Sequence, residues 1–97
     1  MVIQVKDLVS AAYTNDDGDT VHAAVAAELA RTPQVTVSFT GIDAVTSSFV
    51  NSAFVPLLEK LGFEEFKKRV RIVDATKPTI QLIKHRLEFE AARHSAA

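Results

Sequence analysis

Three short runs of apolar, mostly β-branched residues divide the chain, and each is followed by turn residues and then by a segment with helical periodicity. These runs predict strands at residues 2–5, 35–39 and 70–73. Strand–helix alternation of this kind favours a mainly parallel sheet with right-handed crossovers and helices packed on it. The sequence therefore predicts an α/β fold with the element order βαβαβα.

Helical periodicity follows the first two strands. The first helix is expected over residues 20–31, where the many alanines favour helix and Asp19 or Thr20 is available as the N-cap. The second helix is expected to begin near Ser47 and to end at Gly62, because glycine commonly lies just past a helix C-terminus. Both helices are expected to bury an apolar stripe against the sheet.

The later part of the chain carries a proline inside the second helix. Pro56 cannot donate its backbone nitrogen to the helix, so we expect a kink or a restart there. Residues 63–68 predict a helical turn before the third strand, and residues 78–92 predict the third helix. The buried stripe expected in that helix is Ile80, Ile83, Leu87 and Ala91. The residues expected in the core are Phe39, Val50, Phe54, Leu57, Leu58, Ile72 and Ile83.

The length of the chain suits one hydrophobic core. Residues 1–97 therefore predict a single domain, with residues 95–97 as a disordered tail. No apolar run reaches the roughly 20 residues needed to cross a bilayer. The first residues also lack the basic start and long apolar segment of a signal peptide. We therefore expect a cytoplasmic protein without a membrane partner.

Several kinds of chemistry have no support in the sequence. The chain contains no cysteine, which excludes disulfides and thiolate nucleophiles. Its net charge of −1 and the lack of aromatic residues within the basic run 67–71 argue against a nucleic-acid partner. The acidic stretch 15–19 lacks a correctly spaced glutamate for a calcium loop, so we expect a solvated turn and no metal site. No catalytic triad or phosphate loop is recognisable, so we predict a protein that is not an enzyme and has no cofactor.

A cluster of hydroxyl side chains is the main candidate site. Residues 35–49 read as a buried strand that runs through a turn into a helix beginning with Thr46, Ser47 and Ser48. Reactive groups of parallel α/β sheets collect at the carboxyl ends of the strands, and a helix start stabilises anions. The hydroxyls are either N-caps or targets of modification. One cap needs one hydroxyl, so capping alone leaves two unexplained.

The same stretch resembles a known family. Val-Thr-Val-Ser-Phe-Thr-Gly-Ile-Asp-Ala-Val-Thr-Ser-Ser-Phe-Val-Asn-Ser-Ala-Phe is similar to the signature of the small STAS-like domains of unknown function. That signature is a hydrophobic strand, a turn, then Thr-Ser-Ser-Phe-Leu-Asn and an Ala-Phe pair. Residues 46–54 carry nearly all of the match, and the order of the other elements agrees over most of the chain. The resemblance implies a STAS-like fold.

The wider STAS group includes the anti-sigma-factor antagonists, which read Asp-Ser-Ser-Gly in this turn. Their first serine is phosphorylated by a partner kinase that is also the anti-sigma factor, and it matches Ser47 here. Two positions depart from that pattern: Thr46 stands in place of the acidic residue and Phe49 in place of the glycine. The resemblance implies a non-enzymatic regulatory domain with Ser47 as the candidate phospho-acceptor.

The contact surface implied for a protein partner lies around the same helix start. The partner-binding residues expected there are Asp43, Thr46, Ser48, Phe49 and Asn51. The partner that the resemblance implies is a kinase-like ATPase of the anti-sigma type. Two other classes of function stay open: a sensor that binds a nucleotide or anion at this helix start, and a structural subunit of a larger complex.

Overall fold

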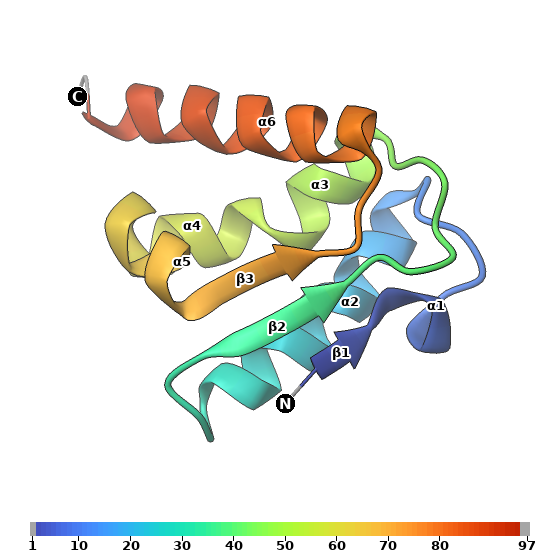
Figure 1. Ribbon diagram of the computed structural model, residues 1–97. Coiled ribbons are helices and arrows are strands. Elements are labelled where there is room, and N and C mark those ends of the chain that lie inside the picture. The colour runs from blue at the N-terminus through green and yellow to red at the C-terminus, as the bar shows by residue number, and fades with distance from the viewer. Residues whose placement is uncertain (1, 96–97) are drawn as a thin grey trace.

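A three-stranded parallel sheet organises the chain (Figure 1). The computed structural model describes residues 2–95. Its strands are β1 (Val2–Gln4), β2 (Val35–Ser38) and β3 (Val70–Val73), arranged in the order β1-β2-β3. All three predicted strands and their parallel arrangement are confirmed, and the α/β fold class with them. Val5 and Phe39, expected at strand ends, lie just outside the strands.

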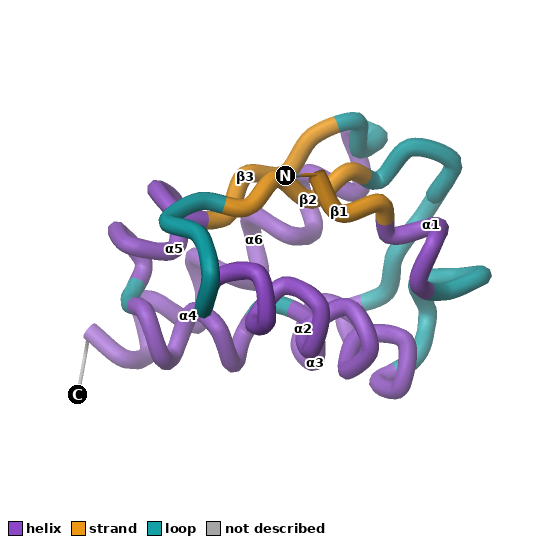
Figure 2. Tube along the Cα trace, turned by 90° about the horizontal axis from the view of Figure 1, so that it is seen from below, coloured by secondary structure: helices purple, strands orange, loops and turns teal. Residues whose placement is uncertain are grey.

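Helices make up most of the rest of the chain. They are α1 (Val5–Leu8), α2 (Asn15–Leu29), α3 (Ser47–Ala53), α4 (Val55–Leu61), α5 (Phe63–Arg69) and α6 (Lys77–Ser95). In Figure 2 the strands form one layer, and α2, α3 and α4 form a second layer on one side of it. Ser95, expected in a disordered tail, closes α6, and residues 96–97 of that tail lie outside the described residues.

The acidic stretch before the first long helix is itself helical. The prediction of a turn at residues 15–19 is wrong, because α2 begins at Asn15. Thr14 is the N-cap: its hydroxyl accepts the Asp17 N–H at 3.1 Å, and the Asp17 carboxylate accepts the Thr14 N–H at 3.2 Å. This reciprocal pair is a capping box, which satisfies backbone donors at both ends of the first turn. The N-cap is therefore neither Asp19 nor Thr20.

Pro56 divides the second predicted helix in two. The first part, α3, ends at Ala53, and α4 restarts at Val55 with Pro56 in its first turn. Proline suits this position because the first helical N–H groups have no partner within the helix. The predicted restart is confirmed. Gly62 ends α4 with a φ of +84°, a conformation that glycine adopts without steric cost.

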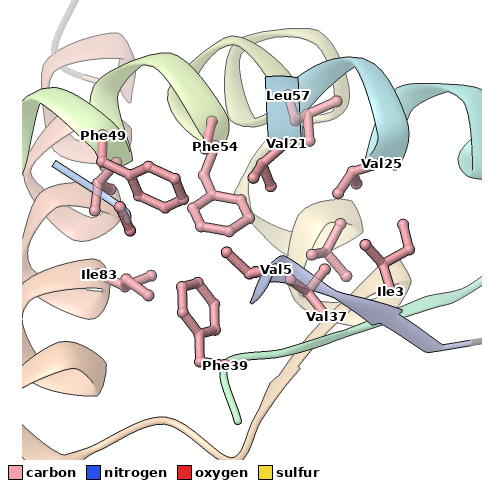
Figure 3. Packing of buried hydrophobic residues seen from close by; sticks show 14 of the residues in the cluster. Ile3, Val5, Val21, Val25, Val37, Phe39, Phe49, Phe54, Leu57 and Ile83 are labelled. Atoms are coloured by element: carbon pink, nitrogen blue, oxygen red, sulfur yellow. The ribbon is translucent and has the colours of Figure 1, made fainter. Parts of the chain in front are cut away.

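The core lies between the sheet and the helices and is rich in phenylalanine (Figure 3). The Phe39 ring lies 6.3 Å from the rings of both Phe49 and Phe54, measured between centroids. The Phe49 and Phe54 rings meet edge to face at 6.4 Å. Burial of the predicted core is confirmed for Phe39, Val50, Phe54, Leu57, Leu58 and Ile83.

Two residues expected inside lie closer to the surface. Ile72 is only half-buried, because β3 is the last strand of the sheet and this residue lines an open groove between β3, α5 and α6. Ile80 is 47% exposed, whereas Thr79 is 2% exposed. The buried side of α6 is thus rotated by one residue at its start relative to the predicted stripe. Ile83 and Leu87 are buried as predicted.

The α2 and α3 helices pack so closely that their backbones are in contact at Gly18. An ideal Cβ atom built on Gly18 would lie 2.6 Å from the Phe49 carbonyl oxygen and 2.6 Å from the Ser52 Cβ. Only glycine fits a contact of this kind without moving one of the helices. Gly18 therefore sets how closely the start of α2 approaches α3.

Arg69 joins the end of α2 to the end of α5. Its guanidinium donates to the carbonyl oxygens of Leu29 at 2.8 Å, Thr32 at 3.3 Å and Pro33 at 3.0 Å. The last turn of α2 contains no Lys, Arg or His of its own. Because the last carbonyls of a helix lack partners within it, Arg69 supplies donors that α2 does not provide.

Candidate functional site

Thr46 fixes the start of α3. Its hydroxyl oxygen accepts the Phe49 N–H at 3.2 Å, which is the N-cap interaction. The same hydroxyl donates to the Tyr13 carbonyl at 2.6 Å, and the Thr46 N–H donates to the Ala12 carbonyl at 3.2 Å. Thr46 therefore caps α3 and also joins it to the segment that precedes α2.

Ser47 and Ser48 occupy the first turn of α3 and are exposed. Their hydroxyls make no hydrogen bond to another residue in the described part of the chain. Because Thr46 already caps the helix, neither serine is needed for that purpose. The capping explanation thus accounts for one hydroxyl of the cluster, and the two serines face solvent.

Phe49 belongs to the core and not to the surface. Its side chain is fully buried and packs on the rings of Phe39 and Phe54. The assignment of Phe49 to the partner-binding surface is therefore corrected. The physical reason is that this side chain points into the core, where Phe39 after β2 and Phe54 after α3 enclose it.

Asn51 is exposed but already has a partner within the chain. Its side-chain oxygen accepts two hydrogen bonds from Arg86, from Nε at 3.0 Å and from Nη2 at 2.8 Å. Arg86 also pairs with Glu90 at 3.0 Å, and Glu90 accepts from Arg93. Arg86 therefore holds α3 to α6. Nothing in its spacing along α6 signals this contact with a residue 35 positions earlier.

A polar cluster around the buried Ser38 joins the carboxyl ends of β2 and β3, and the sequence reasoning missed it. Ser38 is 1% exposed, and its hydroxyl donates to the Asp74 carboxylate at 2.9 Å and lies 3.0 Å from the Thr40 hydroxyl. Asp74 has a φ of +58°, the left-handed region that aspartate tolerates better than most residues. The Asp43 carbonyl, in the loop between β2 and α3, accepts from the Thr76 hydroxyl at 3.3 Å. These contacts hold together the loops that follow the two strands.

Asp17 is the acidic residue whose electrostatics are clearly perturbed. Desolvation raises the pKa of its carboxyl, but hydrogen bonds from the Tyr13 and Thr14 N–H groups and the Thr14 side chain outweigh that effect. The pKa of Asp17 therefore lies below its ordinary value. The acidic stretch acts in helix capping, and residues 2–95 contain no group of three or more potential ligands that could hold a metal ion.

These features define a small α/β domain that presents two free serine hydroxyls at a helix start following a parallel strand. Residues 17–79 match the family described as STAS-like domain of unknown function (DUF4325). The chain belongs to this family. The match includes β2, β3 and the whole of α3, and so every residue from Asp43 to Asn51. No curated protein and no solved structure matches the chain. Among the helices described, none is both long enough and apolar enough to cross a membrane.

Proposed function

We propose that this protein is a non-enzymatic regulatory domain that binds another protein through the start of α3 and is switched by phosphorylation of Ser47. The observation that carries this proposal is that Thr46 and Ser47 have different roles in the hydroxyl cluster. Thr46 caps α3, while the neighbouring Ser47 hydroxyl is exposed and makes no hydrogen bond to a described residue. Ser47 is therefore available to a kinase without loss of the cap.

The position of Ser47 also suits a switch. A phosphate adds about −1.5 to −2 charges, and at a helix N-terminus it is compatible with the helix dipole. Modification is therefore expected to leave the fold intact and to change the charge of the surface. Asn51 lies one turn after Ser47 on the same face of α3. Its hydrogen bond with Arg86 places a positive charge beside this face.

The contact surface is smaller than the sequence suggested. Asp43, Ser48 and Asn51 are exposed and remain in it, whereas Phe49 is excluded by burial. Thr46 acts mainly by holding the surface in place. The partner that the STAS resemblance implies is a kinase-like ATPase of the anti-sigma type, which would both bind this surface and phosphorylate it.

The experiment uses the full chain, a purified kinase-like ATPase of the anti-sigma type, and ATP. Mass spectrometry should find one phosphate on Ser47 in the wild type and in Ser48→Ala, the matched control, and none in Ser47→Ala. Calorimetry should show that Ser47→Asp binds the ATPase more weakly than Ser47→Ala does. Equal binding by all variants together with an unmodified Ser47 would refute the switch.

Stability measurements separate this function from capping. Thr46→Ala should lose about 0.5–2 kcal/mol, as loss of an N-cap does. Ser47→Ala should stay within about 0.5 kcal/mol of the wild type, as exposed substitutions usually do. A loss at Ser47 as large as the loss at Thr46 would favour a structural role for both. Binding of ATP by the chain alone would favour the sensor function over the switch.

A further inference from the structure

The outer edge of β3 has no strand beside it in the described chain. Within residues 2–95, β3 pairs only with β2. The Val73 carbonyl accepts the Phe39 N–H at 3.0 Å, so Val73 directs its backbone groups toward β2. Successive residues of a strand direct these groups to opposite sides, so the Ile72 N–H and carbonyl point away from β2. An edge of this kind is a template for another strand.

An apolar groove runs along this edge. It has a volume of about 420 Å³ and lies between α5, β3 and α6. Its floor is formed by buried side chains of α5 and α6, and the exposed Ile80 lies among its lining residues. The buried side chains are Phe66, Ile83 and Leu87. The groove is thus large enough for side chains of an added segment, within the range typical of binding pockets.

The charges along the groove indicate what fits there. Lys67, Arg71 and Lys84 line it, together with the acidic Glu88. Lys67 lies over the Phe63 ring at 5.3 Å, which holds this cation beside the apolar surface. A second copy of the chain, paired through the same edge by a two-fold axis, would bring these cations together at one seam. The excess of positive charge instead favours an acidic partner.

We propose that the β3 edge and this groove dock an extended acidic segment of another protein, which adds a fourth strand to the sheet. Side chains of a strand alternate between its two faces. Every second residue of the segment is apolar and enters the groove, and the acidic residues between them lie within reach of the cations that border it, among them the exposed Arg71. None of residues 43–51 lines the groove, so this docking is separate from the proposed switch.

The test uses a synthetic seven-residue peptide of alternating acidic and apolar residues, Glu-Val-Asp-Ile-Glu-Val-Asp, with blocked ends. It should bind the full chain, shift the NMR signal of the Ile72 amide and slow the hydrogen exchange of that amide. A peptide with lysine at every acidic position, or with proline in place of the central Ile, should bind about tenfold more weakly or less. Equal binding of the three peptides would overturn the proposal.

Variants locate the site. Arg71→Glu and Ile80→Asp change exposed positions, and each should weaken peptide binding by about tenfold. Lys60→Glu makes the same charge change as Arg71→Glu at an exposed residue outside the groove, and it should bind like the wild type. The proposal fails if these three variants bind equally or if the peptide shifts signals of α3 and not of β3. It also fails if sedimentation shows that the wild type is a dimer and that Ile80→Asp makes it a monomer.

Discussion

Replacement of Gly18 by alanine tests the contact between α2 and α3. The new Cβ would lie 2.6 Å from the Phe49 carbonyl oxygen, 2.6 Å from the Ser52 Cβ and 3.0 Å from the Ala53 nitrogen. Two of these neighbours are backbone atoms of α3, so a change of side-chain rotamer does not relieve the clash. The helices must move apart.

Two opposing effects set the size of the loss. Alanine in place of glycine inside a helix stabilises by up to about 1 kcal/mol. Overpacking typically costs about 1–3 kcal/mol, and contact with backbone places Gly18→Ala at the upper end of that range. The expected net loss is about 2 kcal/mol, which lowers the Tm of a domain of this size by about 8–16 °C.

Urea unfolding and amide NMR spectra measure both consequences. Gly62→Ala is the control, because a Cβ there meets no atom within 4 Å but the φ of +84° disfavours alanine. Both variants should lose stability, yet only Gly18→Ala should shift the amide signals of residues 47–53. A Gly18→Ala protein as stable as the wild type, with unchanged α3 signals, would refute the contact.

Two further predictions concern the core and the N-terminus of α2. Phe54→Ala removes a fully buried ring that contacts three other aromatic rings, and it should lower the free energy of unfolding in urea by about 3–5 kcal/mol. An unchanged free energy of unfolding would contradict the position of Phe54 in the centre of the core. The lowered pKa of Asp17 stabilises the folded state above the unfolded-state value of about 4, and this contribution disappears as the pH falls through the folded-state pKa. The stability difference between the wild type and Asp17→Asn should therefore narrow below about pH 4, and a difference independent of pH would contradict the capping box.

Local signals in the sequence sufficed for the strands and for the position of most helices. The β-branched runs, Pro56 and Gly62 act through their own backbone preferences, so their effects are readable without the tertiary structure. The capping box of Thr14 and Asp17 is also a local signal. The Asn, Asp and Gly residues of the stretch 15–19 are also typical of turns, so the start of α2 was predicted too late in the sequence.

The burial of Phe49 depended on contacts that no local pattern shows. Helical spacing correctly placed Val50 and Phe54 in the core, because they face the sheet side of α3. The Phe49 ring is enclosed by Phe39, which follows β2, and by Phe54, so its burial depends on how α3 packs against the sheet. The bond between Asn51 and Arg86 is equally non-local.

The exposure of Ile80 has a similar cause. A stripe of apolar residues predicted burial, but the start of α6 turns Thr79 inward, where its hydroxyl accepts a hydrogen bond from the Thr76 hydroxyl at 2.9 Å. Hydropathy alone ranks isoleucine above threonine for the interior. The hydrogen bond between Thr76 and Thr79 lets Thr79 be buried instead, and Ile80 lies exposed beside the groove.

The hydrogen bonds that Arg69 donates at the end of α2 form only when distant parts of the chain come together. The carbonyls of Leu29, Thr32 and Pro33 receive these bonds only after a chain segment of nearly forty residues has closed into a loop. The capping box at the start of α2 needs only neighbouring residues, whereas the Leu29 carbonyl receives its partner only once α5 is in place. The two ends of this helix therefore depend on contacts of different range, local at the N-terminus and tertiary at the C-terminus.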